Sequence, residues 1–310
     1  MPKIIESKGI CKRFGKTEAL RNISVSVNES EIFGLIGPDG AGKTTFLRIV
    51  TTLLLPDEGT MYVLGKNCVS DYKKLRSRIG YMPGRFSLYQ DLTVEENIEF
   101  YATVFGTTVK KNYDLIADIY SHIEPFKDRP AGKLSGGMKQ KLALSCALIH
   151  KPKILILDEP TTGVDAVSRS EFWDMLDKLK KLNITIIVST PYMDEAMRCD
   201  RIALMQNGTI LAVDTPDKVS AGFNRKLFSI KSAEKYKLIT VLRSMDETVS
   251  SFPFGETVHA TFIEDISIPI IAEKLKIQGI ADAIIHEINP CIEDRFLELM
   301  QDDNFKNHLV

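Results

Sequence analysis

A glycine-rich segment has the residue types and the spacing of a phosphate-binding loop. The pattern GxxxxGK[ST], placed between an apolar strand and a helix, is matched by Gly37-Pro38-Asp39-Gly40-Ala41-Gly42-Lys43-Thr44-Thr45. Glycines let the backbone fold tightly around phosphate oxygens, and the N–H groups and helix dipole attract anions. We expect Lys43 to reach the β and γ phosphates of a nucleotide and the Thr44 hydroxyl to ligate Mg²⁺.

Two consecutive carboxylates, Asp158 and Glu159, follow the apolar run Ile154-Leu155-Ile156-Leu157. In open α/β sheets ligands bind at the carboxyl ends of the strands, so this pair is predicted to reach the same site. Asp158 is expected to hold the metal through water, and Glu159 to orient or deprotonate the attacking water. The alternative is two exposed carboxylates that merely end a strand.

A second anion site is predicted at Ser135-Gly136-Gly137, which precedes an amphipathic helix over residues 139–149. A serine and two small residues at a helix N-terminus are suited to binding phosphate. One chain with a phosphate loop and a further phosphate-binding helix end suggests that this end acts on another subunit's nucleotide. Taken alone, Ser-Gly-Gly is a turn and a helix cap.

The elements that position these residues predict an α/β core. Short unbroken apolar runs at residues 32–36, 154–157 and 184–188 fit strands of a mostly parallel sheet buried on both faces, although a buried helix gives a similar run. Between about residues 91 and 150 the pattern becomes helical, which indicates an insertion. Thr93 and Glu96 have the spacing of a capping box at its start.

The last third of the chain predicts a second, smaller domain. After a short helix near residue 216, the order is strand, helix, strand, strand, helix, strand, helix, at residues 227–230, 236–245, 249–252, 258–263, 270–277, 283–288 and 292–300. The βαββαβ order indicates a ferredoxin-like α+β domain. We therefore expect domains at 1–222, with the helical subdomain at about 91–150, and at 223–310.

Composition excludes several classes of protein. The 40 basic and 41 acidic residues give a net charge of −1, and 44% hydrophobic with 26% charged residues is typical of a soluble globular protein. Neither disorder nor a nucleic-acid partner is suggested. The five cysteines form no CxxC pair, so neither a disulfide framework nor a zinc site is indicated. No run is apolar enough to span a bilayer, and the N-terminus lacks a signal-peptide pattern.

Together, these motifs over about residues 3–222 resemble the ATP-binding subunit of ABC transporters. The resemblance rests on the phosphate loop, the LSGG-type signature, the Walker B strand ending in LDEP, and the loop Thr162-Gly163-Val164-Asp165. It implies a P-loop NTPase with a RecA-like core, ATP and Mg²⁺ as cofactors, ATPase activity, and Phe14 stacking on adenine; a core phenylalanine is the alternative for Phe14.

The resemblance also implies partners and a location. Each ATP would lie between one chain's phosphate loop and the other chain's signature, in a head-to-tail dimer that drives separate integral membrane permease subunits from the cytoplasmic face of the cell membrane. The segment Pro290-Cys291-Ile292-Glu293-Asp294-Arg295-Phe296 resembles the tail of drug- or polysaccharide-exporter ATPases. Nothing in the sequence specifies a transported substrate.

Two positions depart from the family's pattern. Gly84 stands where the family has a glutamine that touches metal and water, and Pro191 where it has a histidine contacting the γ-phosphate. Gln90 is a possible substitute for the glutamine. The residues that grip the triphosphate are intact, so we expect a site that binds ATP and cleaves it poorly. A heterodimer, whose other subunit carries the glutamine and the histidine, follows from this hypothesis.

Two other functions remain open at this point. One is a regulatory ABC subunit that does not hydrolyse ATP, which the departures at Gly84 and Pro191 favour. The other is a soluble ABC protein of DNA repair or translation, which the near-neutral charge and the absence of a long coiled-coil insertion disfavour.

Overall fold

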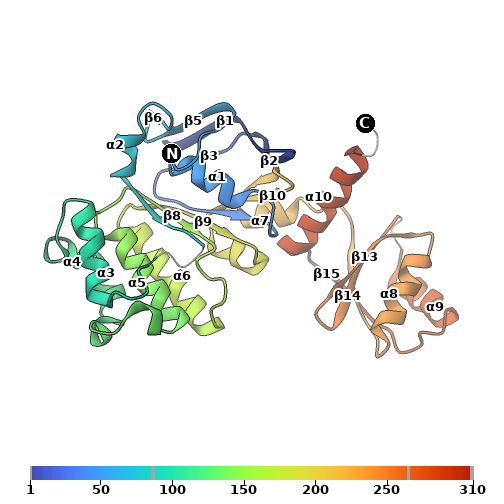
Figure 1. Cartoon of the computed structure of the whole chain (residues 1–310). Helices are drawn as coiled ribbons and strands as arrows, with labels where there is room; N and C mark the ends of the chain where they lie inside the picture. The colour runs from blue at the N-terminus through green and yellow to red at the C-terminus, as the bar shows by residue number, and fades with distance from the viewer. Residues whose placement is uncertain (1, 85–87, 264–265, 308–310) are drawn as a thin grey trace. The chain divides into compact units, whose positions relative to one another are not determined.

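The chain folds into two compact units, Met1–Pro216 and Asp217–Val310 (Figure 1). The computed structural model describes residues 2–84, 88–263 and 266–307.

A six-stranded sheet forms the centre of the first unit, in the order β11-β10-β4-β9-β8-β7. Its strands are β4 (Ile32–Ile36), β7 (Ile79–Met82), β8 (Ile154–Asp158), β9 (Thr185–Thr190), β10 (Arg201–Gln206) and β11 (Thr209–Asp214). All pairings from β10 to β7 are parallel, and β11 is antiparallel to β10. Every residue of β4, β8 and β9 is buried, as expected of apolar strands covered on both faces. The predicted α/β fold class is confirmed.

An antiparallel sheet, which the sequence did not reveal, accompanies the central one. Its strands follow the order β2-β1-β5-β6, and β3 pairs with β1. They are β1 (Lys3–Phe14), β2 (Thr17–Ile23), β3 (Ser26–Asn28), β5 (Glu58–Val63) and β6 (Lys66–Asn67). The helix α1 (Lys43–Val50) contacts β2 and β5 of this sheet and β8 of the central one.

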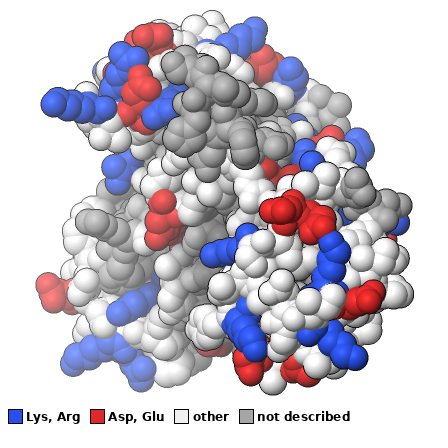
Figure 2. Space-filling view, turned by 90° about the vertical axis from the view of Figure 1, so that its right-hand side faces the viewer, with Lys and Arg blue, Asp and Glu red and all other residues white. Residues whose placement is uncertain are grey.

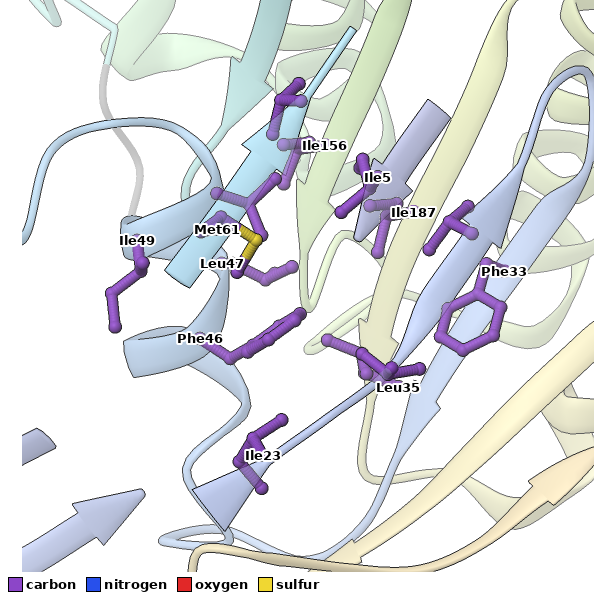
Figure 3. Close-up of a cluster of buried hydrophobic side chains, with 14 of the residues drawn as sticks. Ile5, Ile23, Phe33, Leu35, Phe46, Leu47, Ile49, Met61, Ile156 and Ile187 are labelled. Atoms are coloured by element: carbon purple, nitrogen blue, oxygen red, sulfur yellow. The ribbon is translucent and has the colours of Figure 1, made fainter. Parts of the chain in front are cut away.

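A cluster of buried hydrophobic side chains packs α1 against both sheets (Figure 3). Phe46 and Leu47 of α1 meet Ile5 and Met61 of the antiparallel sheet and Ile156 of the central sheet in one buried cluster. Each such side chain contributes about 1.5–3 kcal/mol when fully buried. This packing holds the first turn of α1, and therefore Lys43 and Thr44, in a rigid position.

Helices lie together at one side of the first unit (Figure 1), where α3, α4 and α5 contact one another. The capping box at the start of α3 is confirmed: Thr93 Oγ1 accepts from the Glu96 N–H, and Glu96 Oε2 accepts from the Thr93 N–H. The α-helices of this unit after α1 are α2 (Tyr72–Arg76), α3 (Val94–Val104), α4 (Val109–Tyr120), α5 (Gly136–Leu148) and α6 (Ala166–Lys181). Helix α7 (Pro216–Ala221) begins at the last residue of this unit and otherwise belongs to the second. Three 3₁₀ segments are η1 (Glu124–Phe126), η2 (Ala131–Lys133) and η3 (Met193–Arg198).

The second unit has the βαββαβ order that the sequence predicted, followed by a terminal helix. The strand order β13-β14-β12-β15, with every pairing antiparallel, is the ferredoxin-like one. The elements are β12 (Leu227–Lys231), α8 (Lys235–Ser244), β13 (Thr248–Phe254), β14 (Thr257–Phe262), α9 (Ile268–Ile277), β15 (Ile284–Ile288) and α10 (Ile292–Asn307). Its own core includes Phe228, Leu238, Val258 and Ile271.

The surface carries both signs of charge. On the face drawn in Figure 2, basic and acidic residues lie among uncharged ones instead of separating by sign. In the part of the chain that the structure describes, no helix combines the length and the apolar character needed to cross a bilayer.

Candidate functional site

The predicted phosphate loop joins the end of β4 to the start of α1. Gly37 is a position where only glycine fits, because a Cβ there would lie 2.1 Å from the Met205 carbonyl oxygen. The Gly37 N–H donates to the Thr190 carbonyl at 3.2 Å, which ties the loop to the end of β9. Gly42, the last residue before α1, has a φ of 102°, in the left-handed region.

Lys43 is 3% exposed and lies folded back into the loop. Its Nζ donates to the Gly37 carbonyl at 2.7 Å and to the Pro38 carbonyl at 3.0 Å. The same ammonium lies 3.3 Å from Glu159 Oε1. A lysine held at the N-terminus of a helix, inside a glycine-rich loop, is suited to contact the phosphates of a nucleotide.

Asp158 and Thr44 are brought together, as the sequence predicted for two metal ligands. Thr44 Oγ1 donates to Asp158 Oδ1 at 3.0 Å, across 114 positions of sequence. Hydroxyl and carboxylate oxygens suit Mg²⁺, a hard cation that proteins commonly hold through one or two side chains in addition to the phosphates. The described residues contain no group of three or more His, Cys, Asp or Glu that could hold a metal ion.

Ser189, which the sequence analysis did not single out, joins the two carboxylate residues. Its hydroxyl donates to Asp158 Oδ1 at 2.6 Å and accepts from the Glu159 N–H at 3.0 Å. Ser189 could have been predicted as a site residue, because it lies near the carboxyl end of a buried strand. Asp158 was predicted on the same ground. Nearby, burial and then the charge of Asp158 raise the pKa of Tyr81 to about 12, although Arg48 opposes this.

Glu159 adopts a left-handed backbone conformation, with a φ of 50°, at the turn that leaves β8. Non-glycine residues seldom adopt this conformation, and it occurs often at functional sites. The side chain is 24% exposed and lines a cavity of about 160 Å³, whose other lining residues include Gly84, Gly136 and Gly163. The candidate water-activating residue therefore faces open space.

Gly84 lies close to the end of β8, since a Cβ there would be 3.0 Å from the Asp158 carbonyl oxygen. Any larger residue at this position would require the neighbouring backbone to shift by a few tenths of an ångström. The rest of its side chain would extend into the cavity that Gly84 lines. Gln90 is exposed, its carbonyl accepts from the Gly132 N–H, and it does not line this cavity among the described residues.

The predicted second anion site has the geometry of a helix start. Ser135 is the N-cap of α5, and its hydroxyl accepts from the Met138 N–H at 3.4 Å. Ser135 and Gly136 are exposed. Gly137 lets α5 approach α6, because a Cβ there would lie 3.0 Å from Ser168 Oγ.

Phe14 is 50% exposed, so the alternative of a core phenylalanine is wrong. Its ring has the Lys12 ammonium 5.7 Å from its centroid. An exposed aromatic ring is available for stacking on a flat ligand.

Known proteins resemble the chain throughout its length. The model of the ABC transporter family matches residues 20–162. "Probable multidrug ABC transporter ATP-binding protein YbhF" from Escherichia coli (strain K12) is 35% identical over 96% of the chain, which spans only 52% of that relative. The Nod factor export ATP-binding protein I from Rhizobium sp. (strain N33) is 32% identical, with 95% of the chain and 96% of the relative covered.

Solved structures of ATP-binding cassettes match about 70% of the chain. The chain matches cbiO1 from Clostridium perfringens, part of an ABC transporter complex, with a TM-score of 0.64 and 28% identity, covering 72% of this chain and 92% of that one. It also matches a dimeric ATP-binding cassette in a post-hydrolysis state bound to ADP and Pi, with a TM-score of 0.62 and 26% identity, covering 68% and 98%.

Proposed function

This chain belongs to the ABC transporter family, as an ATP-binding protein, and on that premise we propose that it drives a separate membrane permease in export while its own nucleotide site cleaves ATP slowly. The observation that carries the proposal is the convergence of Lys43, Thr44, Asp158 and Glu159 on one edge of the central sheet. The names of the relatives, which refer to multidrug transport and Nod factor export, support the direction of transport.

The phosphate loop would bind ATP through its backbone N–H groups and the Lys43 ammonium, and Phe14 would stack on the base. Thr44 and Asp158 would hold Mg²⁺, which when bound neutralises charge on the phosphates. Ser189 keeps Asp158 in place from the neighbouring strand. Glu159 would orient the attacking water or accept its proton.

The same site lacks two groups that assist hydrolysis. Gly84 has no side chain, and Pro191 has neither an N–H nor an imidazole to offer a γ-phosphate. A positioned group that moves a proton contributes about 10²- to 10⁴-fold in rate, or roughly 3–5 kcal/mol of barrier. None of the groups that hold the triphosphate is missing, so binding should persist while turnover falls.

The exposed start of α5 supports a role in trans. Ser135 and Gly136 face solvent at a helix N-terminus, where N–H groups attract anions. In a head-to-tail dimer they would complete the site of a second ABC ATPase subunit that carries the glutamine and the histidine. We therefore favour a heterodimer attached to permease subunits at the cytoplasmic face of the cell membrane.

The proposal is tested with the purified chain, by titration calorimetry with MgATP and by phosphate release. We expect binding, its loss in Lys43→Ala, and turnover well below about 1 s⁻¹, the low end for ordinary enzymes. Gly84→Gln/Pro191→His should raise turnover by about 10²-fold or more, and adding Glu159→Gln to that variant should remove the gain.

Glu99→Gln, on the exposed face of α3, is the matched control and should change neither quantity. Turnover of several per second by the unmodified chain would exclude the slow site, and absence of MgATP binding would exclude the whole proposal.

A regulatory subunit that never hydrolyses ATP is the second candidate, and the glycine at position 84 and the proline at 191 favour it. The two candidates differ in the double variant: if Gly84→Gln/Pro191→His does not raise turnover above that of the unmodified chain, the regulatory role is preferred.

A further inference from the structure

Glu195 is a buried glutamate that belongs neither to the phosphate loop nor to the carboxylate pair Asp158 and Glu159. It lies in η3, directly after β9, and is 4% exposed. Its Oε2 accepts two hydroxyl hydrogen bonds, from Thr161 Oγ1 at 3.0 Å and from Thr190 Oγ1 at 2.6 Å. Oε1 is buried and has no hydrogen-bond partner among the described residues. Burying a carboxylate is unfavourable unless it is well hydrogen-bonded, so this placement calls for a physical explanation.

The two threonines belong to the two segments that leave the central sheet at the candidate site. Thr161 is two residues after Glu159, and its carbonyl accepts from the Val164 N–H at 3.3 Å, inside the turn that leads to α6. Thr190 ends β9, and its hydroxyl also accepts from the Tyr192 N–H at 3.1 Å. One carboxylate oxygen therefore joins the loop after β8 to the segment after β9.

Thr190 extends this connection to the phosphate loop, because its carbonyl accepts from the Gly37 N–H at 3.2 Å. A separate contact joins α6, which follows residues 160–165, to the segment after β9: the Arg169 guanidinium lies 5.0 Å from the Tyr192 ring centroid. Neither contact uses the side chain of residue 191. The phosphate loop is thus linked to residues 160–165 through backbone and buried groups alone.

We propose that Glu195 is a positioning residue that fixes the loop of residues 160–165 against the end of β9, and through Thr190 against the phosphate loop, without using the side chain of Pro191. Thr162, Gly163 and Asp165 in this loop are exposed and available to a partner subunit. The consequence for a partner's site rests on the proposed function, whereas the positioning itself is a property of this chain.

Hydrogen exchange of the full-length chain, without nucleotide, tests the positioning. Glu195→Leu removes both oxygens, and we expect the amides of Thr162 and Val164 to exchange about tenfold faster or more, as when a local opening loses buried hydrogen bonds. Exchange in β4 and β8 should stay unchanged. Glu195→Gln keeps one acceptor oxygen for both hydroxyls and should stay within about threefold of the unmodified chain.

Glu99→Gln serves as the control at an exposed site. Because Glu195→Leu can fail to fold, Thr161→Val is made in parallel: it removes one donor, leaves Glu195 in place, and should loosen the same loop. Unchanged exchange of residues 162–164 in the folded variants, or an equal loss of protection throughout the central sheet, would overturn the proposal.

MgATP affinity of the folded variants should stay within about threefold of the unmodified chain, because Lys43 and Thr44 keep their contacts. A larger loss would mean that Glu195 supports the phosphate loop as a whole and does not act on residues 160–165 in particular. Failure of the unmodified chain to bind MgATP would contradict the proposed function. It would not affect the positioning role of Glu195, because the exchange experiment is done without nucleotide.

Discussion

Ser189 shows how much of the candidate site depends on single side chains outside the recognisable motifs. Asp158 Oδ1 accepts hydrogen bonds from two hydroxyls, those of Thr44 and Ser189, which come from α1 and β9. Ser189 also accepts from the Glu159 N–H, at the residue with the left-handed backbone. Metal-binding and catalytic groups need such supporting hydrogen bonds to keep their geometry.

Ser189→Ala should lower the free energy of unfolding by about 1–2 kcal/mol, because a buried hydrogen bond to a carboxylate is lost. It should also weaken MgATP binding, since Asp158 then keeps only one of its two hydroxyl donors. Urea unfolding followed by the fluorescence of Trp173, the one tryptophan of the chain, measures the first effect. Ser70→Ala, at an exposed position, is the control. Equal stability of both variants would show that the Ser189 bonds contribute nothing.

Among the single elements, helix α3 begins at a position that two residues determine. Thr93 and Glu96 each satisfy a backbone N–H that the first turn of a helix leaves without a partner. Thr93 precedes the first helical residue, Val94, as the sequence predicted. The capping box therefore fixes where the helical insertion begins after the β7 strand.

Thr93→Ala should destabilise the first unit by about 1 kcal/mol, the usual effect of removing a threonine N-cap. Glu99→Ala on the exposed face of the same helix should leave stability unchanged or raise it slightly, because alanine favours the helix. Denaturant unfolding of both variants checks the difference. If Thr93→Ala matched Glu99→Ala, the cap would not limit the stability of the unit.

At the scale of the whole molecule, the two units have separate cores and separate buried polar groups. In the second unit, His259 Nδ1 lies 2.7 Å from Asp294 Oδ1, and Asp294 Oδ2 accepts from the Cys291 N–H at 2.9 Å. Asp294 thereby joins the start of α10 to β14. Burial opposes ionisation of Asp294, but the hydrogen bonds from His259 and from Cys291 outweigh it and hold its pKa below the ordinary 3.8.

Asp294→Asn should reduce the stability of the second unit at pH 7 by about 1.5–3 kcal/mol, because hydrogen bonds to a buried carboxylate are lost. Because the pKa of Asp294 is lower in the folded state, its contribution is present above pH 3.8 and is lost as the pH falls through the folded value. The difference from the unmodified chain should therefore shrink below pH 3.8. Calorimetric unfolding against pH measures it, with the exposed Glu293→Gln as control. A difference that stays constant down to pH 2 would contradict this assignment.

Much of this protein could be predicted from local sequence. The phosphate loop, the strands β4, β8 and β9, the cap of α3 and the βαββαβ order of the second unit are all encoded in stretches of a few to a few dozen residues. Glycine spacing, apolar runs and capping pairs act over such short distances, so they can be recognised without a structure.

The antiparallel sheet and the polar network around the site were decided by the tertiary structure. Ser189 meets Asp158 across 31 positions, and Glu195 meets Thr161 across 34. These contacts exist because β9 pairs with β8 on one side and β4 on the other, which brings the three carboxyl ends together. The distant hydrogen-bond partner of a serine, a threonine or a glutamate cannot be predicted from local sequence. It depends on the order of the strands in the sheet and not on the neighbouring residues in the chain.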